Sequence, residues 1–308
     1  MNMDNEPGDG PDFRCGHVTI LGRPNVGKST LLNRLLGQKI SITSRKPQTT
    51  RWHLLGVDSG PQYQIIYIDT PGIQNRYDNA LNRHMMQEAL DTIGRVDLVL
   101  FVVEALKWNR ADEFALEKIE QFRIPCLLVI NKIDKVGDKK ELLPYITRLQ
   151  ERFDFLEIIP VSAKTGKNTE ELHSVVVKNL PFGPPAFPED QLTDRSERFL
   201  AAEFIREKLT RKLGSELPYR ITVTTDEFRE EENLIRIHAT IWVESAGQKA
   251  IVIGKAGQIL KSAGEQARHD MENLFQKKVY LNTWVKVKRK WTEQENALRQ
   301  LGYNVNKY

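Results

Sequence analysis

Short apolar runs recur through the first 180 residues, each about as long as a buried strand. The first is followed, after residues 22–29, by residues 30–36, in which four leucines recur at helical spacing. The runs lie at residues 18–21, 65–68, 98–103, 126–130 and 158–161. Strand-length runs joined by amphipathic segments predict an α/β domain with a central, mostly parallel sheet over residues 16–180.

The pattern changes beyond residue 190, where alternating apolar and polar positions become common. The predicted elements are a helix over 195–213, strands over 219–225 and 234–243, a helix over 259–275 and a strand over 279–288. This order predicts a smaller α+β domain over residues 191–308. In the last strand Thr283 interrupts the apolar set, and alternation places Trp284, Lys286 and Lys288 on one face.

The segments outside these domains have a different character. Residues 181–190 contain four prolines, which predicts an extended linker. The chain opens with an acidic stretch that bears Gly and Pro and has no signal-peptide pattern, so residues 1–15 are predicted to be disordered. The longest apolar runs are too short to span a membrane.

Charge separates the two halves of the chain. Residues 191–308 hold 21 Lys and Arg against 16 Asp and Glu, a balance of +5, whereas residues 1–190 hold 24 against 25, or −1. This modest excess permits a nucleic-acid partner for the second domain without requiring one. Cys15 and Cys126 are isolated, which is typical of a reduced cytosolic protein.

A glycine-rich loop stands between the first apolar run and the first helix. It fits the phosphate-binding pattern G-x-x-x-x-G-K-[ST], whose backbone N–H groups surround a phosphate chain at the positive end of a helix. Lys28 would contact the β- and γ-phosphates, and Ser29 would offer its hydroxyl to Mg²⁺. The nucleotide contacts predicted here are Gly22, Asn25, Val26, Gly27, Lys28, Ser29 and Thr30.

Three further motifs end later apolar runs in order. Asp69 could reach Mg²⁺, usually through water, while the Gly72 amide could meet a γ-phosphate. Asp134 could accept two hydrogen bonds from guanine, and adenine lacks both donors, so a buried carboxylate there would reject it. A backbone amide after the last run would meet the guanine O6. The predicted contacts are Asp69, Gly72, Asn131, Lys132, Asp134, Ser162, Ala163 and Lys164.

Together these motifs resemble the translation-factor-like GTPases, which implies GTP and GDP as ligands with Mg²⁺. A nucleotide-sensing segment should then lie before Asp69, and residues 46–51 are the candidate. Thr50 would coordinate Mg²⁺ and sense the γ-phosphate, with Thr49 as the alternative. A plain surface loop is the other interpretation of this segment.

Catalysis is expected to be slow in the isolated chain. In Ras-like enzymes a glutamine follows the glycine of the D-x-x-G motif and orients the attacking water. Here that motif is residues 69–72, and the next residue is Ile73. Asn25 resembles the asparagine of GTPases that hold K⁺ beside the phosphates, but it could equally serve only to shape the loop. Catalytic roles are therefore predicted for Lys28, Asn25 and Thr50.

The second domain carries a GxxG signature between two predicted elements. Residues 253–259 resemble the signature of KH domains, and the element order resembles the type II form. Such glycines let an RNA backbone approach, and a neighbouring apolar groove receives splayed bases. Predicted RNA contacts are Ile253, Gly254, Lys255, Ala256 and Gly257, together with Lys286 and Lys288, for which a solvated sheet edge is the alternative.

A P-loop GTPase followed by a type II KH domain resembles the Era family of bacterial GTPases over residues 17–303. The resemblance implies binding to the 3′ end of small-subunit (16S) ribosomal RNA, control of that binding by GTP, and a role in 30S subunit assembly. It also implies a monomeric, cytoplasmic protein with partial attachment to the inner membrane. The rival hypothesis is an RNA-binding module whose nucleotide domain only adds stability. The RNA affinity of such a protein would not depend on the bound nucleotide.

Overall fold

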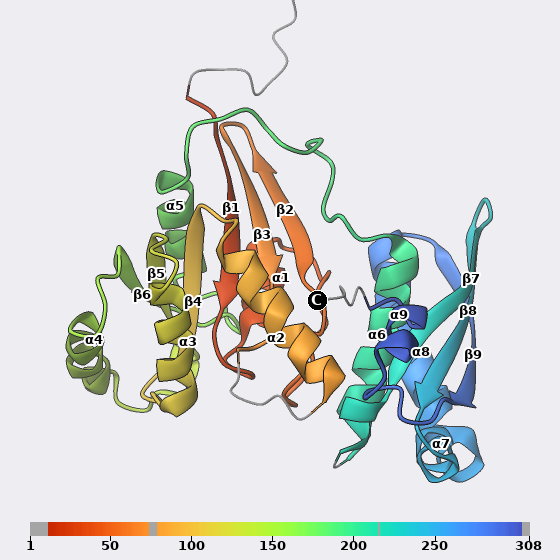
Figure 1. The fold of residues 1–308 in the computed structure, drawn as a ribbon. Coiled ribbons are helices and arrows are strands. Elements are labelled where there is room, and N and C mark those ends of the chain that lie inside the picture. Colours follow the sequence, from red (N-terminus) through yellow and green to blue (C-terminus); the bar gives the residue numbers. More distant parts are fainter. Residues whose placement is uncertain (1–11, 74–78, 215, 304–308) are drawn as a thin grey trace, which may run out of the picture. The chain divides into compact units, whose positions relative to one another are not determined.

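The computed structural model describes residues 12–73, 79–214 and 216–303, which form two compact units (Figure 1). Among the described residues, the first unit takes 12–41, 50–73 and 85–194. The second takes 42–49, 79–84 and the remainder from residue 195. The expected disorder of residues 1–15 lies outside the described residues up to residue 11, and it is wrong for Arg14 and Cys15, which belong to a strand.

The first unit is built on a six-stranded sheet in the order β2-β3-β1-β4-β5-β6. Its strands are β1 (Arg14–Leu21), β2 (Leu54–Gly60), β3 (Tyr63–Asp69), β4 (Leu98–Glu104), β5 (Cys126–Asn131) and β6 (Glu157–Pro160). Only β2 runs antiparallel to its neighbour, so the predicted mostly parallel sheet is confirmed. The strand β2 was not anticipated.

Helices connect these strands, as parallel pairing requires. They are α1 (Lys28–Leu35), α2 (Ala80–Ile93), α3 (Arg110–Glu120), α4 (Leu142–Gln150) and α5 (Thr169–Lys178), with 3₁₀ turns η1 (Ile133–Lys135) and η2 (Lys139–Glu141). One sheet face packs against α3, α4 and the later part of α2, with Phe101, Val103 and Leu128 among the buried residues. The carboxyl ends of β1, β3, β4, β5 and β6 consequently share one edge of the sheet, where the sequence motifs lie.

The proline-rich segment is attached to the first unit, which extends to Asp194 rather than ending at residue 180. Gln64 on β3 is only 1% exposed, and its Oε1 accepts hydrogen bonds from the amides of Ala186 (2.7 Å) and Phe187 (2.9 Å). Its Nε2 donates to the Phe187 carbonyl at 2.8 Å. Leu192 continues the attachment, since its carbonyl accepts from the Val57 amide at 2.9 Å.

We expect Gln64→Leu to lower the free energy of unfolding by about 1–3 kcal/mol, because two amides and a carbonyl of the segment would lose their buried partner. Urea denaturation followed by circular dichroism measures this. Gln62→Leu is the matched control, since Gln62 is exposed. Equal stability of the two variants would contradict the anchoring role of Gln64.

The second unit has a three-stranded sheet in the order β7-β8-β9, with β7 and β8 antiparallel and β8 and β9 parallel. Its elements are α6 (Glu197–Lys212), η3 (Leu217–Arg220), β7 (Thr222–Glu230), β8 (Leu234–Val243), α7 (Ala246–Ile253), η4 (Lys255–Gly257), α8 (Gln258–Phe275), β9 (Lys278–Val287) and α9 (Glu295–Gln300). The predicted order of elements is confirmed, with three differences. Helices α7 and α9 were not anticipated. Strand β7 begins at Thr222 because residues 217–220 form a 3₁₀ turn with Pro218 in its first positions.

Residues 42–49 belong to this second unit although they lie early in the chain. Ile42 is 3% exposed in the apolar core, with Phe204 and Leu209 of α6. The Thr43 amide donates to Oε1 of Glu207 at 2.8 Å, and Glu207 is fully buried. Arg206 donates to the Thr49 carbonyl. Both ends of the segment are therefore held by α6.

Candidate functional site

The glycine-rich loop joins β1 to α1 in a conformation that requires glycine at two positions. Gly22 has φ 143° and Gly27 has φ 107°, both unfavourable for other residues. A Cβ on Gly22 would lie 2.3 Å from the Val102 carbonyl oxygen, and one on Gly27 would lie 2.4 Å from Nδ2 of Asn131. The loop is thus packed tightly against β4 and β5 and leads directly into the start of α1.

Lys28 is the buried cation of this loop. Its Nζ donates to the carbonyls of Gly22 at 3.1 Å and Arg23 at 3.2 Å. Burial lowers the pKa of Lys28 to about 8, although the Asp69 carboxylate opposes that shift. A phosphate chain in the loop would supply the anionic partner that favours the charged ammonium.

The three predicted metal ligands lie together at the end of β3. Ser29 Oγ donates to Oδ2 of Asp69 at 2.7 Å and lies 2.9 Å from Oγ1 of Thr50, which is itself 3.5 Å from the same carboxylate oxygen. Thr49, the alternative, turns its hydroxyl to Ser44 and to the Lys46 carbonyl. The geometry therefore favours Thr50.

Asp69 suits a divalent cation. Its carboxylate is fully buried, and Oδ1 lacks a hydrogen-bond partner within the described residues. Burial raises the pKa of Asp69, while Lys28 and the hydroxyls of Ser29 and Ser41 act in the opposite direction. Hydroxyl and carboxylate oxygens are the ligands that Mg²⁺ takes, with water completing its shell. The residues present fit that ion.

The predicted base-binding residues also converge. Asn131 is 2% exposed; its Nδ2 donates to the Val26 carbonyl at 2.8 Å, and its Oδ1 accepts from the Ala163 amide at 3.0 Å. Ser162 Oγ donates to Oδ1 of Asp134 at 2.6 Å. Asn131 thus ties the ends of β5 and β6 to the phosphate loop, and Ser162 orients the carboxylate expected to read guanine.

Three side chains of the site were missed by the sequence analysis. Glu104 at the end of β4 pairs with Nζ of Lys132 and of Lys107, and these two cations, against the effect of burial, lower its pKa to about 2. Arg34 donates to the carbonyls of Ala163 and Lys164. Ser41 donates to Asp69 at 2.7 Å. Of these three residues, only Glu104 could have been identified from the sequence, because it ends a buried parallel strand as the motif residues do.

The remaining predicted residues line the entrance. Asn25 is exposed with φ 66°, and its carbonyl accepts from Lys132 Nζ. Thr30 is exposed on α1. Gly72 lies against Pro24, since a Cβ there would be 2.8 Å from the Pro24 nitrogen. Ile73 is fully buried in the apolar core, so it offers nothing to an attacking water.

In the second unit the GxxG loop separates α7 from α8. Gly254 (φ 74°), Ala256 (φ 49°) and Gly257 (φ 76°) are left-handed, and Lys255 is exposed. Ile253 packs against the core. A groove runs beside the loop between α8 and β9, and its lining includes Gly257, Leu260, Lys261, Gly264, Leu281 and Thr283. The lining also includes the basic Arg236, Arg268 and Lys278 and the acidic Glu265 and Glu272, so the concave surface combines apolar groups with more basic than acidic ones.

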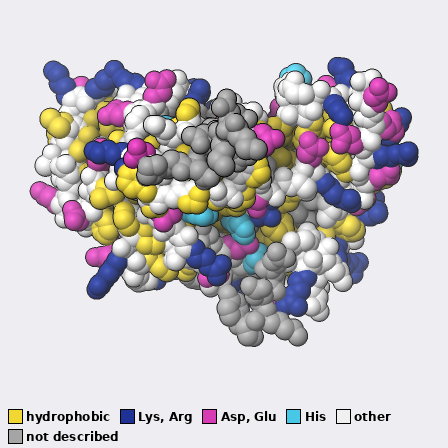
Figure 2. Space-filling model, turned by 90° about the horizontal axis from the view of Figure 1, so that it is seen from above, with side chains coloured by type: hydrophobic (Ala, Val, Ile, Leu, Met, Phe, Trp, Pro, Cys, Tyr) yellow, Lys and Arg dark blue, Asp and Glu magenta, His cyan; other side chains and the backbone are white. Residues whose placement is uncertain are grey.

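Lys286 and Lys288 stand apart from that groove. Leu281 and Thr283 line the groove together with Lys278 and Tyr280 at the start of β9, whereas the end of that strand, with Lys286, is not part of the lining. The molecular face drawn in Figure 2 shows Lys and Arg interspersed with Asp and Glu rather than gathered in one patch. No helix within the described ranges is long and apolar enough to cross a membrane.

Comparisons with known proteins agree with both halves of this description. The family described as 50S ribosome-binding GTPase matches residues 17–132, and the KH domain family matches residues 216–292. GTPase Era of Ectopseudomonas mendocina (strain ymp) is 51% identical over 295 residues, which cover 96% of this chain and 99% of the relative.

Two solved structures share the whole architecture. One is Era in complex with MgGDPNP and nucleotides 1506–1542 of 16S ribosomal RNA, and the other is an Aquifex aeolicus Era variant bound to GDP·AlF4−. Each aligns with a TM-score of 0.91 at 40% identity and covers 95% of this chain and 100% of the other. With a relative at 51% identity over nearly its entire length, the chain belongs to the Era family of GTPases.

Proposed function

We propose that this GTPase binds the 3′ end of 16S ribosomal RNA through its KH unit and acts as a GTP-controlled switch in 30S subunit assembly. The open GxxG loop beside a groove that is apolar and more basic than acidic carries this proposal, because it offers RNA backbone and bases separate places to bind. The relative solved with 16S nucleotides supports the choice of RNA. A ribosomal RNA ligand places the protein in the cytoplasm; attachment to the inner membrane would then be peripheral.

The nucleotide roles follow from the geometry of the first unit. The amides of residues 25–30 and the Lys28 ammonium would hold the phosphates, and Asp134 would accept from guanine while Ser162 fixes its orientation. Ser29, Thr50 and Asp69 would hold Mg²⁺, which when bound neutralises phosphate charge. The hydroxyl of Thr50 would exchange its contact with Ser29 for the metal, so the end of segment 42–49 would respond to the nucleotide.

Replacing Na⁺ by K⁺ should raise the GTP turnover rate if Asn25 supports a monovalent cation beside the phosphates. Ile73 cannot orient water, so charge stabilisation is the main route left to this site. Steady-state phosphate release at equal ionic strength measures the effect. Asn25→Ala is the diagnostic variant; the same rates in both salts would leave Asn25 with a purely structural role.

The RNA proposal is tested by affinity for a single-stranded RNA matching the 16S 3′ end, at fixed salt, with GDP or a non-hydrolysable GTP analogue. We expect tighter binding with the analogue. Gly254→Asp should weaken binding about tenfold or more, because its Cβ would meet Ile259 at 2.6 Å and its charge would repel phosphate. Gly247→Asp on α7, where a Cβ meets nothing closer than 3.9 Å, is the control.

Affinity that is the same in both nucleotide states would favour the rival hypothesis, in which the first unit does not gate RNA binding. Wild-type affinity in Gly254→Asp would remove the groove from the proposal. Segment 42–49 supplies the physical reason to expect gating, because its last residue, Thr49, is followed directly by Thr50 while Arg206 and Glu207 of α6 hold the segment near its two ends. Coupling of this kind needs an element whose contacts differ between the two nucleotide states.

A further inference from the structure

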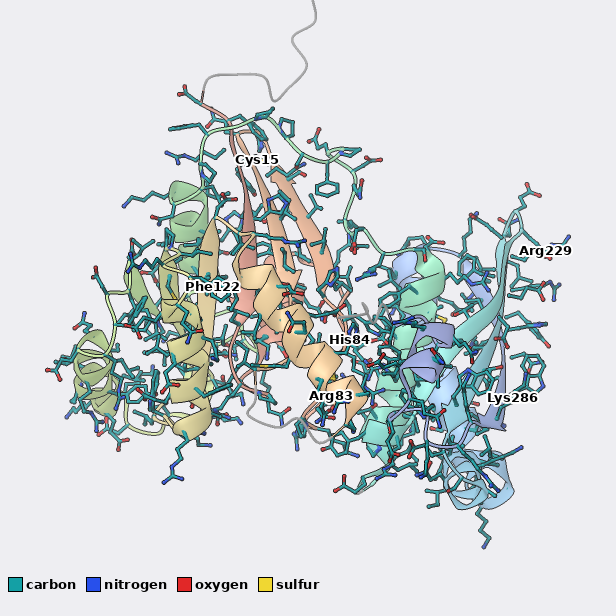
Figure 3. The ribbon with its side chains drawn as sticks, in the orientation of Figure 1. Cys15, Arg83, His84, Phe122, Arg229 and Lys286 are labelled. Carbon is teal, nitrogen blue, oxygen red and sulfur yellow. The ribbon has the colours of Figure 1, made fainter. Side chains whose placement is uncertain are left out.

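The sheet of the second unit has one face that the helices leave open. Ile235, Ile237, Val279 and Val285 point into the core formed with α6 and α8. Their strand neighbours therefore point the other way, and Figure 3 shows Lys286 and Arg229 projecting on that side. Tyr280 and Trp284 are 48% and 42% exposed there. We call this surface the open face; its members used below are Arg236, His238, Trp242, Tyr280, Trp284, Lys286 and Lys288.

The aromatic rings of the open face are held in place by neighbours and accompanied by cations. Nε1 of Trp242 donates to Oγ1 of Thr224 at 2.9 Å, and the Nζ atoms of Lys286 and Lys288 each lie 5.8 Å from its ring centroid. His238 lies edge-on to Trp284 at 5.3 Å between ring centroids. Rings fixed in this way offer stacking surface at little cost in side-chain entropy.

Charge divides the open face into two parts. Near the β7–β8 turn the cations are neutralised, since Arg236 pairs with Glu231 at 2.9 Å and His238 lies 3.4 Å from Glu227. At the other end Lys286 and Lys288 form no ion pair within the described residues. The part that holds Trp242 and Trp284 therefore keeps a positive charge beside its rings.

A surface that presents planar rings beside lysines without ion pairs suits a ligand with planar groups and many negative charges. Single-stranded nucleic acid is such a ligand. The groove meets this surface at Arg236 and Tyr280, which belong to its lining. Because β9 is an edge strand of its sheet, a chain can pass from one surface to the other around that edge. A GxxG loop clamps only about four nucleotides, so a longer RNA needs additional surface.

We propose that the open face is a second single-stranded RNA site, in which Trp284 and Trp242 stack bases and Lys286 and Lys288 contact phosphates. The open face would bind the nucleotides of a longer RNA that leave the groove and pass around β9. This inference rests on the proposed RNA-binding function, and it commits to RNA because the lysines lack acidic partners while the rings are exposed. A protein partner is the alternative that the experiment below separates.

The test compares two RNAs matching the 16S 3′ end, one of about five nucleotides and one of about twelve, on the full chain. Trp284→Ala and the double variant Lys286→Gln, Lys288→Gln should weaken the longer RNA roughly tenfold and leave the shorter one unchanged. For the longer RNA, the double variant should also reduce the slope of log affinity against log salt concentration by an amount that corresponds to about two phosphate contacts. Arg229→Gln, an exposed cation elsewhere on β7, is the control and should affect neither RNA.

The outcomes distinguish this inference from the proposed function. If Gly254→Asp abolishes binding of both RNAs while the open-face variants behave as the wild type, the groove stands and the second site is wrong. Equal losses for short and long RNA would also overturn it. Unchanged RNA affinity combined with loss of binding to 30S subunits would assign the face to a protein. Circular dichroism of each open-face variant, together with unchanged affinity for the short RNA bound by the same unit, reports that the variant is folded.

Discussion

Asp134→Asn should weaken guanine-nucleotide binding by about 2–5 kcal/mol, roughly 30- to 4,000-fold. In the proposed role, the Asp134 carboxylate would accept from the N1–H and the 2-amino group of guanine, whereas an asparagine amide would place an N–H donor opposite one of these donors. Xanthine carries an oxygen in place of that amino group, so the same variant should bind xanthine nucleotides more tightly than the wild type. Competition with a fluorescent GDP analogue measures both affinities.

Ser162→Ala is the control for that exchange of specificity. It removes the hydroxyl that donates to Asp134 but keeps the carboxylate, so guanine affinity should fall by only about 1 kcal/mol and xanthine should gain nothing. A variant at residue 134 that loses affinity for both bases equally would mean that the residue supports the loop rather than reads the base.

Lys28→Met should have opposite effects on nucleotide binding and on stability. Removing the cation should weaken GTP binding by about 2–5 kcal/mol, because the phosphates would lose a buried charge partner. The free energy of unfolding without nucleotide should instead rise by about 1–3 kcal/mol, since the wild type buries an ammonium that only carbonyls and a nearby carboxylate stabilise. Isothermal titration and thermal unfolding measure the two quantities.

The pH dependence of stability provides a separate check on Lys28. Its folded pKa of about 8 lies below the usual 10.5, so between these values the unfolded chain binds more protons than the folded one. This residue therefore makes the nucleotide-free protein gain stability as pH rises from about 8 towards 10. Lys28→Met should lack that component. GTP affinity should fall over the same interval, because the phosphates favour the charged form; a flat profile would contradict the buried position.

Local sequence sufficed to predict that the motif residues come together, because each motif ends a strand of one parallel sheet. Asp69, Asn131 and Ser162 meet for that reason alone. Glu104 also ends such a strand, whereas Arg34 lies on α1, and both act through neighbours distant in sequence. Their roles appear only when β4, α1 and the last loop are placed together.

The elements that the sequence analysis missed have local features that favour another structure. Segment 246–253 contains Gly247 and ends in Ile251, Val252 and Ile253, a composition typical of a strand. It is helical because Ser245 caps it, accepting from the Gln248 amide at 3.2 Å, and because Val252 is buried in the core. Strand β2 contains Gly56 and polar residues, and it is stabilised by antiparallel pairing with β3.

The early residues 42–49 have a consequence for how the chain acquires its structure. A fragment beginning at residue 195 would lack Ile42 in its core and the Thr43 amide on the buried Glu207, so it should be less stable than the same unit in the full chain. During synthesis this segment leaves the ribosome long before α6, its structural support. The segment that we propose to sense the nucleotide therefore reaches its final conformation only when most of the protein has been made.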